Sequence, residues 1–194
     1  MKVRTMALTA FLFAPAISTA QSGASQPVST PPVEASQLHV LVGQWDLVVR
    51  PAATTLAARI HGAPRLVGTW KAWSDLDGWG IEDELRVTDR SGNPALLSHS
   101  IRVFDRASKK WKSESLDVYQ GVFSAGTGEW RDGQLFFNSQ GTEAGRAYLT
   151  RTRYYDITPT SFHWQQDRSF DDGRSWTEAV LRIDATRVAT VAPR

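Results

Sequence analysis

The chain has 194 residues, a net charge of +2 at pH 7 and no cysteine. Without cysteine it has no disulfide, no thiolate metal site and no cysteine nucleophile, so its stability depends on a hydrophobic core. Lys2 and Arg4 carry the charge excess, and the other 20 basic residues balance the 20 acidic ones, which gives no electrostatic reason to bind nucleic acid or an anionic membrane.

The first segment, residues 1–20, has the order of a secretory signal peptide. Lys2 and Arg4 come first, an apolar run over residues 7–17 follows, and the small residues Ser18, Thr19 and Ala20 come last. The apolar run is too short to anchor in a bilayer. We expect cleavage near Ala20 and, because export without cysteine is typical of bacterial envelopes, a periplasmic or secreted location.

The next segment, residues 21–32, is rich in Gln, Ser, Thr, Ala and Pro and has almost no large apolar side chain. Such a segment cannot bury enough surface to offset the entropy of ordering, so we predict a flexible linker. Residues 33–187 are then enough for one domain, and residues 188–194 form a disordered tail.

A short helix is predicted over residues 33–41, because it begins after two prolines and has Leu38 and Leu41 on one side. After it, turn dipeptides such as Asp77-Gly78 separate runs rich in Val, Ile, Thr and aromatic residues. Strands are predicted at residues 44–49, 66–73, 79–88, 95–104, 111–119, 122–124, 129–131, 134–139, 146–157, 161–170 and 176–183. A long meander usually closes to remove its edges, so the predicted fold is all-β: a single antiparallel up-and-down barrel of about ten strands with the helix as a plug.

Two motifs lie at the ends of this meander. Gly43-Gln44-Trp45, directly after the helix, has the Gly-x-Trp pattern with which lipocalin barrels begin, where glycine lets the first strand bend and tryptophan seals the closed end. Residues 169–176 fit the Asp-box pattern Ser-x-Asp-x-Gly-x-Thr-Trp, with serine in place of threonine. Propellers repeat this pattern in every blade, and its single occurrence here predicts only a hairpin.

Together these motifs resemble a group of bacterial lipocalin-like (calycin) secreted proteins, labelled a domain of unknown function and placed near the nitrobindin-type barrels. The resemblance covers most of residues 41–187. It is carried by residues 42–46, 78–84, 102–105, 110–111, 162–166, 169–178 and 184–187. It implies a lipocalin-like barrel and no agreed activity.

Nitrobindin-like relatives bind haem through a histidine and begin with Gly-x-Trp-x-Gly-x-Gly. Residues 43–49 lack the later glycines, so we predict no cofactor and keep haem, with His163 as the conceivable axial ligand, as an alternative. The four histidines are scattered without metal-binding spacing, so no metal site is predicted.

Acidic residues in the strand around residue 83 provide candidate site residues. Alternation puts Glu82 and Glu84 on one face and Asp83 on the other, among apolar neighbours. A carboxylate in such a place is either paired, with Arg102 as the possible partner, or has a raised pKa. We interpret it first as a buried ion pair that fixes the barrel and second as part of a ligand or acid–base site.

A later strand provides the best pocket candidates. Phe162, Trp164 and Gln166 share one face and His163 lies on the other. The aromatic face should point inward, which places the Gln166 amide inside the barrel, where it needs a partner; packing of the core alone explains the pattern equally well. The ligand-binding candidates are Trp164, Gln166, Asp83, Arg102 and Trp79.

Export, a barrel with a lumen, eight tryptophans and the lack of a catalytic motif favour a protein that binds a small apolar or amphipathic molecule in the lumen. The alternative is an isomerase, cyclase or hydrolase that uses lumenal Asp83, Glu84 or His163 as acid or base, although the sequence leans against an enzyme. A third possibility is a structural or interaction protein with a filled barrel and an exposed apolar patch.

Overall fold

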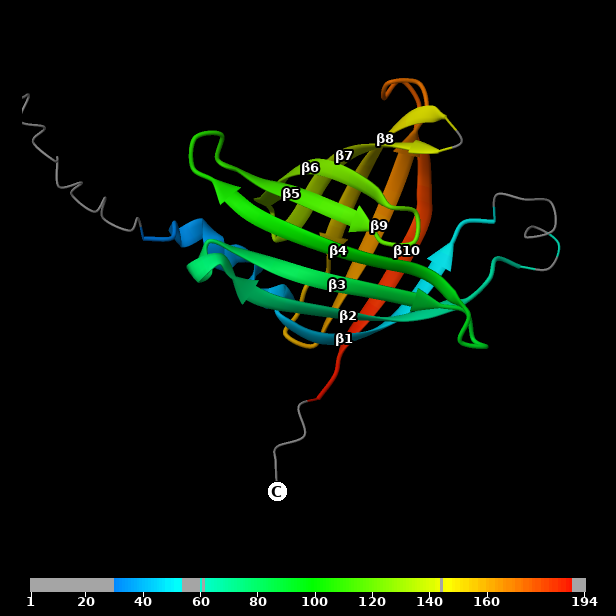
Figure 1. Ribbon diagram of the computed structural model, residues 1–194, viewed down its shortest axis with the longest axis horizontal. Helices are drawn as coiled ribbons and strands as arrows, with labels where there is room; N and C mark the ends of the chain where they lie inside the picture. The colour runs from blue at the N-terminus through cyan, green and yellow to red at the C-terminus, as the bar shows by residue number, and fades with distance from the viewer. Residues whose placement is uncertain (1–29, 54–59, 61, 144, 190–194) are drawn as a thin grey trace, which may run out of the picture. The chain divides into compact units, whose positions relative to one another are not determined.

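The computed structural model describes residues 30–53, 60, 62–143 and 145–189. Within this part of the chain, ten antiparallel strands close into a barrel in which each strand pairs with the next and β1 pairs with β10 (Figure 1). The strands are β1 (Gly43–Pro51), β2 (Leu66–Asp75), β3 (Gly80–Thr88), β4 (Pro94–Asp105), β5 (Lys110–Asp117), β6 (Val122–Arg131), β7 (Gln134–Glu143), β8 (Arg146–Tyr155), β9 (Ser161–Ser169) and β10 (Thr177–Arg187). The predicted all-β barrel is confirmed. The predicted signal peptide, most of the linker and most of the tail lie outside the described residues.

The main difference from the predicted strands is in β6, where two short strands were expected and one continuous strand is found. Its middle contains glycines that weaken the hydrophobic pattern, and yet these residues pair with β5 and β7. A side chain at Gly128 would collide with the ring of Phe137, which packs across the inner face of the strand. The close packing of β6 against β7 therefore requires glycine at position 128, although this glycine weakens the strand pattern in the sequence.

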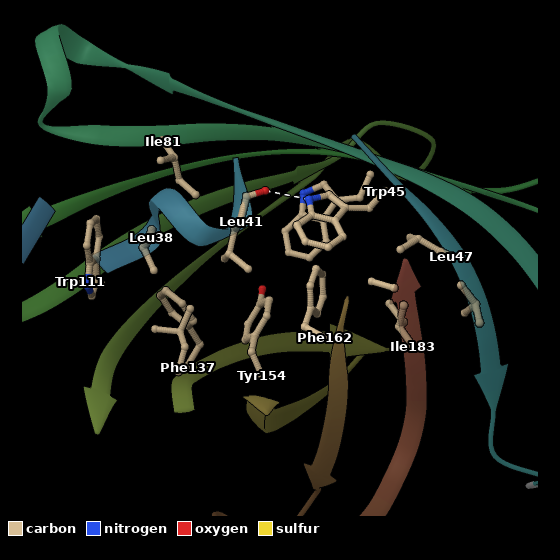
Figure 2. Packing of buried hydrophobic residues seen from close by; sticks show 14 of the residues in the cluster. Leu38, Leu41, Trp45, Leu47, Ile81, Trp111, Phe137, Tyr154, Phe162 and Ile183 are labelled. Carbon is tan, nitrogen blue, oxygen red and sulfur yellow. Dashed lines mark hydrogen bonds between the residues drawn. The ribbon is translucent and has the colours of Figure 1, made fainter. Parts of the chain in front are cut away.

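One end of the barrel is closed by the 3-10 helix η1 (Val33–Leu41), as predicted. Ala35, Leu38 and Leu41 are buried and recur every third residue, which matches the three residues per turn of a 3-10 helix. The two leucines are 0% exposed and enter the same cluster as Trp111, Phe137 and other core residues (Figure 2). Each fully buried leucine contributes roughly 1.5–3 kcal/mol, so the plug is part of the core.

Trp45 and Arg187 complete this closed end. Trp45 is 0% exposed, and its Nε1 donates to the Leu41 carbonyl oxygen at 2.8 Å (Figure 2). Gly43 has a φ of 134°, and a Cβ there would collide with the guanidinium of Arg187. The glycine of the Gly-x-Trp motif thus provides both the backbone conformation and the space that this closure needs.

β1 runs from the closed end of the barrel to Pro51. We call the opposite end of the barrel, at Pro51, the mouth. The neighbouring 3-10 turn η2 (Leu76–Gly78) joins β2 to β3 at the closed end. None of the helices in the described residues is long and apolar enough to span a membrane.

Candidate functional site in the lumen and its mouth

The inner surface of the barrel changes in character along its axis. Near the closed end the inward side chains are large and apolar, and they form one buried cluster. Towards the mouth, the strand register places small hydroxyl residues on the inner face: Ser98, Ser100, Ser113, Ser115, Ser124, Ser139, Thr150 and Thr152. The closed half of the barrel is therefore filled, whereas the half near the mouth is lined by short polar side chains.

Some of these hydroxyls bond to each other across neighbouring strands. The Ser100 and Ser115 hydroxyl oxygens are 2.8 Å apart, and those of Ser139 and Thr150 are 2.6 Å apart. Such pairs satisfy part of the hydrogen-bonding capacity of the inner wall while adding little volume.

Asp83 and Arg102 lie between these two regions. They form a salt bridge in which the side chains are 3% and 10% exposed. The Arg102 guanidinium also lies over the ring of Phe137, with Cζ 5.5 Å from its centroid. Asp83 is therefore held by an arginine on the inner wall.

A cavity of about 460 Å³ opens at the mouth, between β1, β7, β9 and β10. We call it the mouth cavity, and it is lined by Pro51, Ala52, Glu143, Gln166, Arg168, Phe170, Thr177, Val180 and Leu181. Gln166 faces inward, opposite Thr152 and Leu181, and makes no hydrogen bond through its amide to the described residues. The volume lies within the range of roughly 300–1,000 Å³ that small-molecule sites occupy.

Arg168 is the charged group that points into the mouth cavity from β9. Its Nη1 donates to Glu143 at 2.9 Å, and its Cζ lies 4.3 Å from the centroid of the Tyr148 ring. Its Nε is buried, and within the described part of the chain it has no hydrogen-bond partner. Burial of an N–H without an acceptor costs free energy, so this donor is available to an acceptor that enters the cavity.

Two of the predicted site residues, Trp164 and Gln166, lie on the inner face of β9. Trp164 is opposite Tyr154 and Ile183, and its ring centroid is 6.5 Å from that of Tyr154. Together with the buried pair of Asp83 and Arg102, four of the five ligand-binding candidates thus line the barrel interior. Whether they contact a ligand stays a prediction.

Trp79, Glu84 and His163 lie elsewhere. Trp79 follows η2 at the closed end, with the Arg106 guanidinium 4.7 Å from its ring centroid. Glu84 is on the outer face of β3, where a hydrogen bond from Arg86 at 2.7 Å holds the pKa of Glu84 below its usual value. The expectation that Glu84 lines the lumen is wrong, because strand alternation turns it away from Asp83.

His163 also lies on the outer face. Its Nδ1 is 2.8 Å from the carboxylate of Asp184, and 42% of its side chain is exposed. The expectation of a lumenal His163 is therefore wrong, and this residue does not fit as an axial ligand for a haem held inside the barrel. Among the described residues there is no cluster of three or more His, Asp or Glu side chains that could hold a metal ion.

Asp167 shapes the mouth from outside the barrel. It is 8% exposed, and it accepts hydrogen bonds from Arg151, Gln165 and the backbone N–H of Ala179, at 2.7, 2.9 and 2.8 Å. Burial raises the pKa of Asp167, but these hydrogen bonds outweigh burial and lower it. Ala179 has a φ of 51° and lies in a bulge of β10 between Thr177 and Leu181, two residues that line the mouth cavity. The buried carboxylate thus fixes the bulge that forms one wall of the cavity.

Arg168, Glu143 and Tyr148 are not among the site residues predicted from the sequence. Alternation from Gln166 places Arg168 on the same inner face, so this part of the site was accessible from the pattern. The pairing with Glu143 was not, because it joins residues on different strands, 25 positions apart.

The chain matches no protein-family model and no curated protein sequence. Among solved structures it is similar to a de novo designed fluorescence-activating β-barrel, with 15% sequence identity and a TM-score of 0.37, over 81% of this chain and 100% of the designed one.

Proposed function

We propose that this protein is an exported barrel that binds a small apolar or amphipathic molecule in its lumen. The observation that carries the proposal is the mouth cavity, in which Gln166 and Arg168 offer hydrogen-bond donors beside the apolar Leu181. A largely apolar cavity with a few placed polar groups is how ligand pockets are built.

The filling of the closed end supports entry of the ligand from the mouth. Leu38, Leu41 and Trp45 fill the closed end and are 0% exposed. A ligand would enter at the mouth and lie with its apolar part towards Trp164 and the buried cluster.

The proposal also covers the kind of barrel that the protein forms and its location in the cell. The resemblance of the Gly43-Gln44-Trp45 opening and of residues 162–166 to lipocalin-like secreted proteins supports a lipocalin-like barrel, and the signal-peptide pattern of residues 1–20 supports a periplasmic or secreted location. Expression in a bacterial host tests the location: the mass of the protein recovered from the periplasm should correspond to cleavage near Ala20.

Filling the mouth cavity tests the binding site. In Leu181→Trp the larger ring should occupy the cavity and reduce binding of Nile red, a neutral apolar dye, at least about tenfold. Val48→Trp is the matched control, because Val48 is on the outer face of β1 and is 39% exposed. Equal dye binding by both variants and the wild type would contradict a lumenal site.

A further inference from the structure

The charges at the mouth cavity indicate the chemistry of the polar end of the ligand. We propose that the ligand is a single-chain amphiphile with one negative charge, whose carboxylate binds Arg168 and whose apolar chain lies in the lumen. This inference rests on the proposed function, because it names the class of molecule that the lumen takes.

Two contacts orient the guanidinium of Arg168, and one of its edges makes no hydrogen bond with the described residues. Nη1 donates to Glu143, and the ring of Tyr148 supports the face of the group. The other edge, formed by Nε and Nη2, makes no hydrogen bond with the part of the chain that the structure describes. Two parallel N–H groups on one guanidinium edge match the two oxygens of a carboxylate.

One N–H of this edge is buried without an acceptor among the described residues. Nε of Arg168 is buried, whereas 22% of the side chain as a whole is exposed. Binding of a carboxylate then removes the cost of an unpaired buried donor and adds a charge-assisted hydrogen bond.

The balance of charge at the mouth suits one negative charge. Arg146 and Arg168 both lie against the ring of Phe170, with Cζ 4.6 and 5.9 Å from its centroid. Glu143 pairs in register with Arg146 and bonds Arg168, so it offsets one of the two cations. Among these three side chains one positive charge is left over, which a carboxylate neutralises and a phosphate dianion would exceed.

The rest of the lining suits an alkyl chain. Phe170, Val180 and Leu181 provide apolar surface in the same cavity, and Trp164 continues this surface on β9 towards the closed end. A molecule with a carboxylate at one end and a hydrocarbon chain at the other can pair with Arg168 and also pack against this apolar surface.

The test compares two ligands that differ only in charge. Dodecanoic acid and methyl dodecanoate are titrated into the purified protein at neutral pH, and binding is followed by displacement of Nile red. The acid should bind at least about tenfold more tightly than the ester, because a hydrogen bond to a charged group is lost in the ester.

Three variants locate the effect. Arg168→Gln should lower the affinity for the acid to that for the ester, so that the ratio of the two affinities falls from at least about tenfold to about one. Thermal denaturation of this variant shows separately that it is folded. Arg153→Gln is the matched control, because Arg153 stacks on Tyr155 on the outer face of the adjacent strand, with Cζ 4.6 Å from the ring centroid. Glu143→Gln should bind the acid more tightly than the wild type, because it removes the competing carboxylate.

The outcomes separate this inference from the proposed function. If Nile red does not bind the wild type, the lumenal site itself is wrong and this inference falls with it. If Nile red binds but the acid and the ester have equal affinities, or if Arg168→Gln and Arg153→Gln behave alike, only the carboxylate inference is overturned.

Discussion

The guanidinium of Arg187 lies over the indole of Trp45, with its Cζ 4.0 Å from the ring centroid. The same group donates to the carbonyl oxygens of Val42 and Val40, at 2.6 and 2.7 Å. The last strand of the barrel is thereby tied to the first strand and to the helix that plugs the closed end.

Removal of this contact should destabilise the barrel. We expect Arg187→Ala to lower the free energy of unfolding by about 2–4 kcal/mol, because it removes a cation–π contact and charged hydrogen bonds. Urea denaturation measures the change. Arg131→Ala, which loses an exposed arginine over Phe136, should cost under about 1 kcal/mol; a similar cost for both variants would show that Arg187 has no special role in closure.

Trp45 and Trp70 offer a comparison between a satisfied and an unsatisfied indole. Both side chains are buried, but Trp45 Nε1 donates to Leu41, whereas Trp70 Nε1 has no acceptor among the described residues. Both Trp→Phe variants lose similar volume, and only Trp45→Phe also loses a hydrogen bond. We expect Trp45→Phe to be more destabilising by about 1–2 kcal/mol in urea denaturation. The reverse order would mean that Trp70 has an acceptor in solution.

Removal of one partner of the buried pair of Asp83 and Arg102 should destabilise the barrel strongly, whereas replacement of both by apolar residues should destabilise it little. Asp83→Ala leaves Arg102 buried without its carboxylate and should cost about 3–5 kcal/mol. The double variant Asp83→Leu/Arg102→Met removes both charges and should recover most of that loss. Thermal denaturation of the three proteins gives the comparison; a double variant as unstable as the single one would argue against an ion pair with a purely structural role.

The hairpin after β9 should have a distinctive titration. Hydrogen bonds from the Ser175 hydroxyl and backbone N–H, and from Ser169, lower the pKa of Asp171 to about 2. Because the folded pKa lies below the usual value of 3.8, the stabilisation of the turn is complete above pH 3.8 and is lost as the pH falls through about 2. NMR titration of the Asp171 carboxyl carbon measures this midpoint.

The matched variant for that titration is Ser175→Ala, in which the midpoint should move up towards 3.8 because the hydroxyl donor is gone. A midpoint that is the same in both proteins would show that the Ser175 hydroxyl does not bond Asp171 in solution.

Several features of the site follow from local pattern alone. The alternation of Phe162, Trp164 and Gln166 against His163 is enough to assign the two faces of β9. The threefold spacing of Ala35, Leu38 and Leu41 likewise marks one buried side of the plug. Such patterns are readable because a strand or helix repeats its geometry every two or three residues.

Other features depend on which strands become neighbours. Asp167 is on the outer face of its strand and by alternation should be exposed, but the bulge of β10 and Arg151 cover it. Gly128 weakens the strand pattern and is required by the ring of Phe137. The outward positions of Glu84 and His163 follow from strand alternation, and this alternation contradicts the expectation that they lie in the lumen.

By itself, the sequence determined that this chain forms a closed meander of antiparallel strands with an apolar plug, because alternation, turn residues and the Gly-x-Trp opening are all local signals. Only the tertiary structure decided where the polar groups meet. The pairs Arg187 with Trp45, Arg168 with Glu143 and Asp167 with Ala179 join residues that the closure and register of the barrel bring together. The first of these pairs completes the closed end, and the other two lie at the mouth cavity; no local period encodes such long-range contacts.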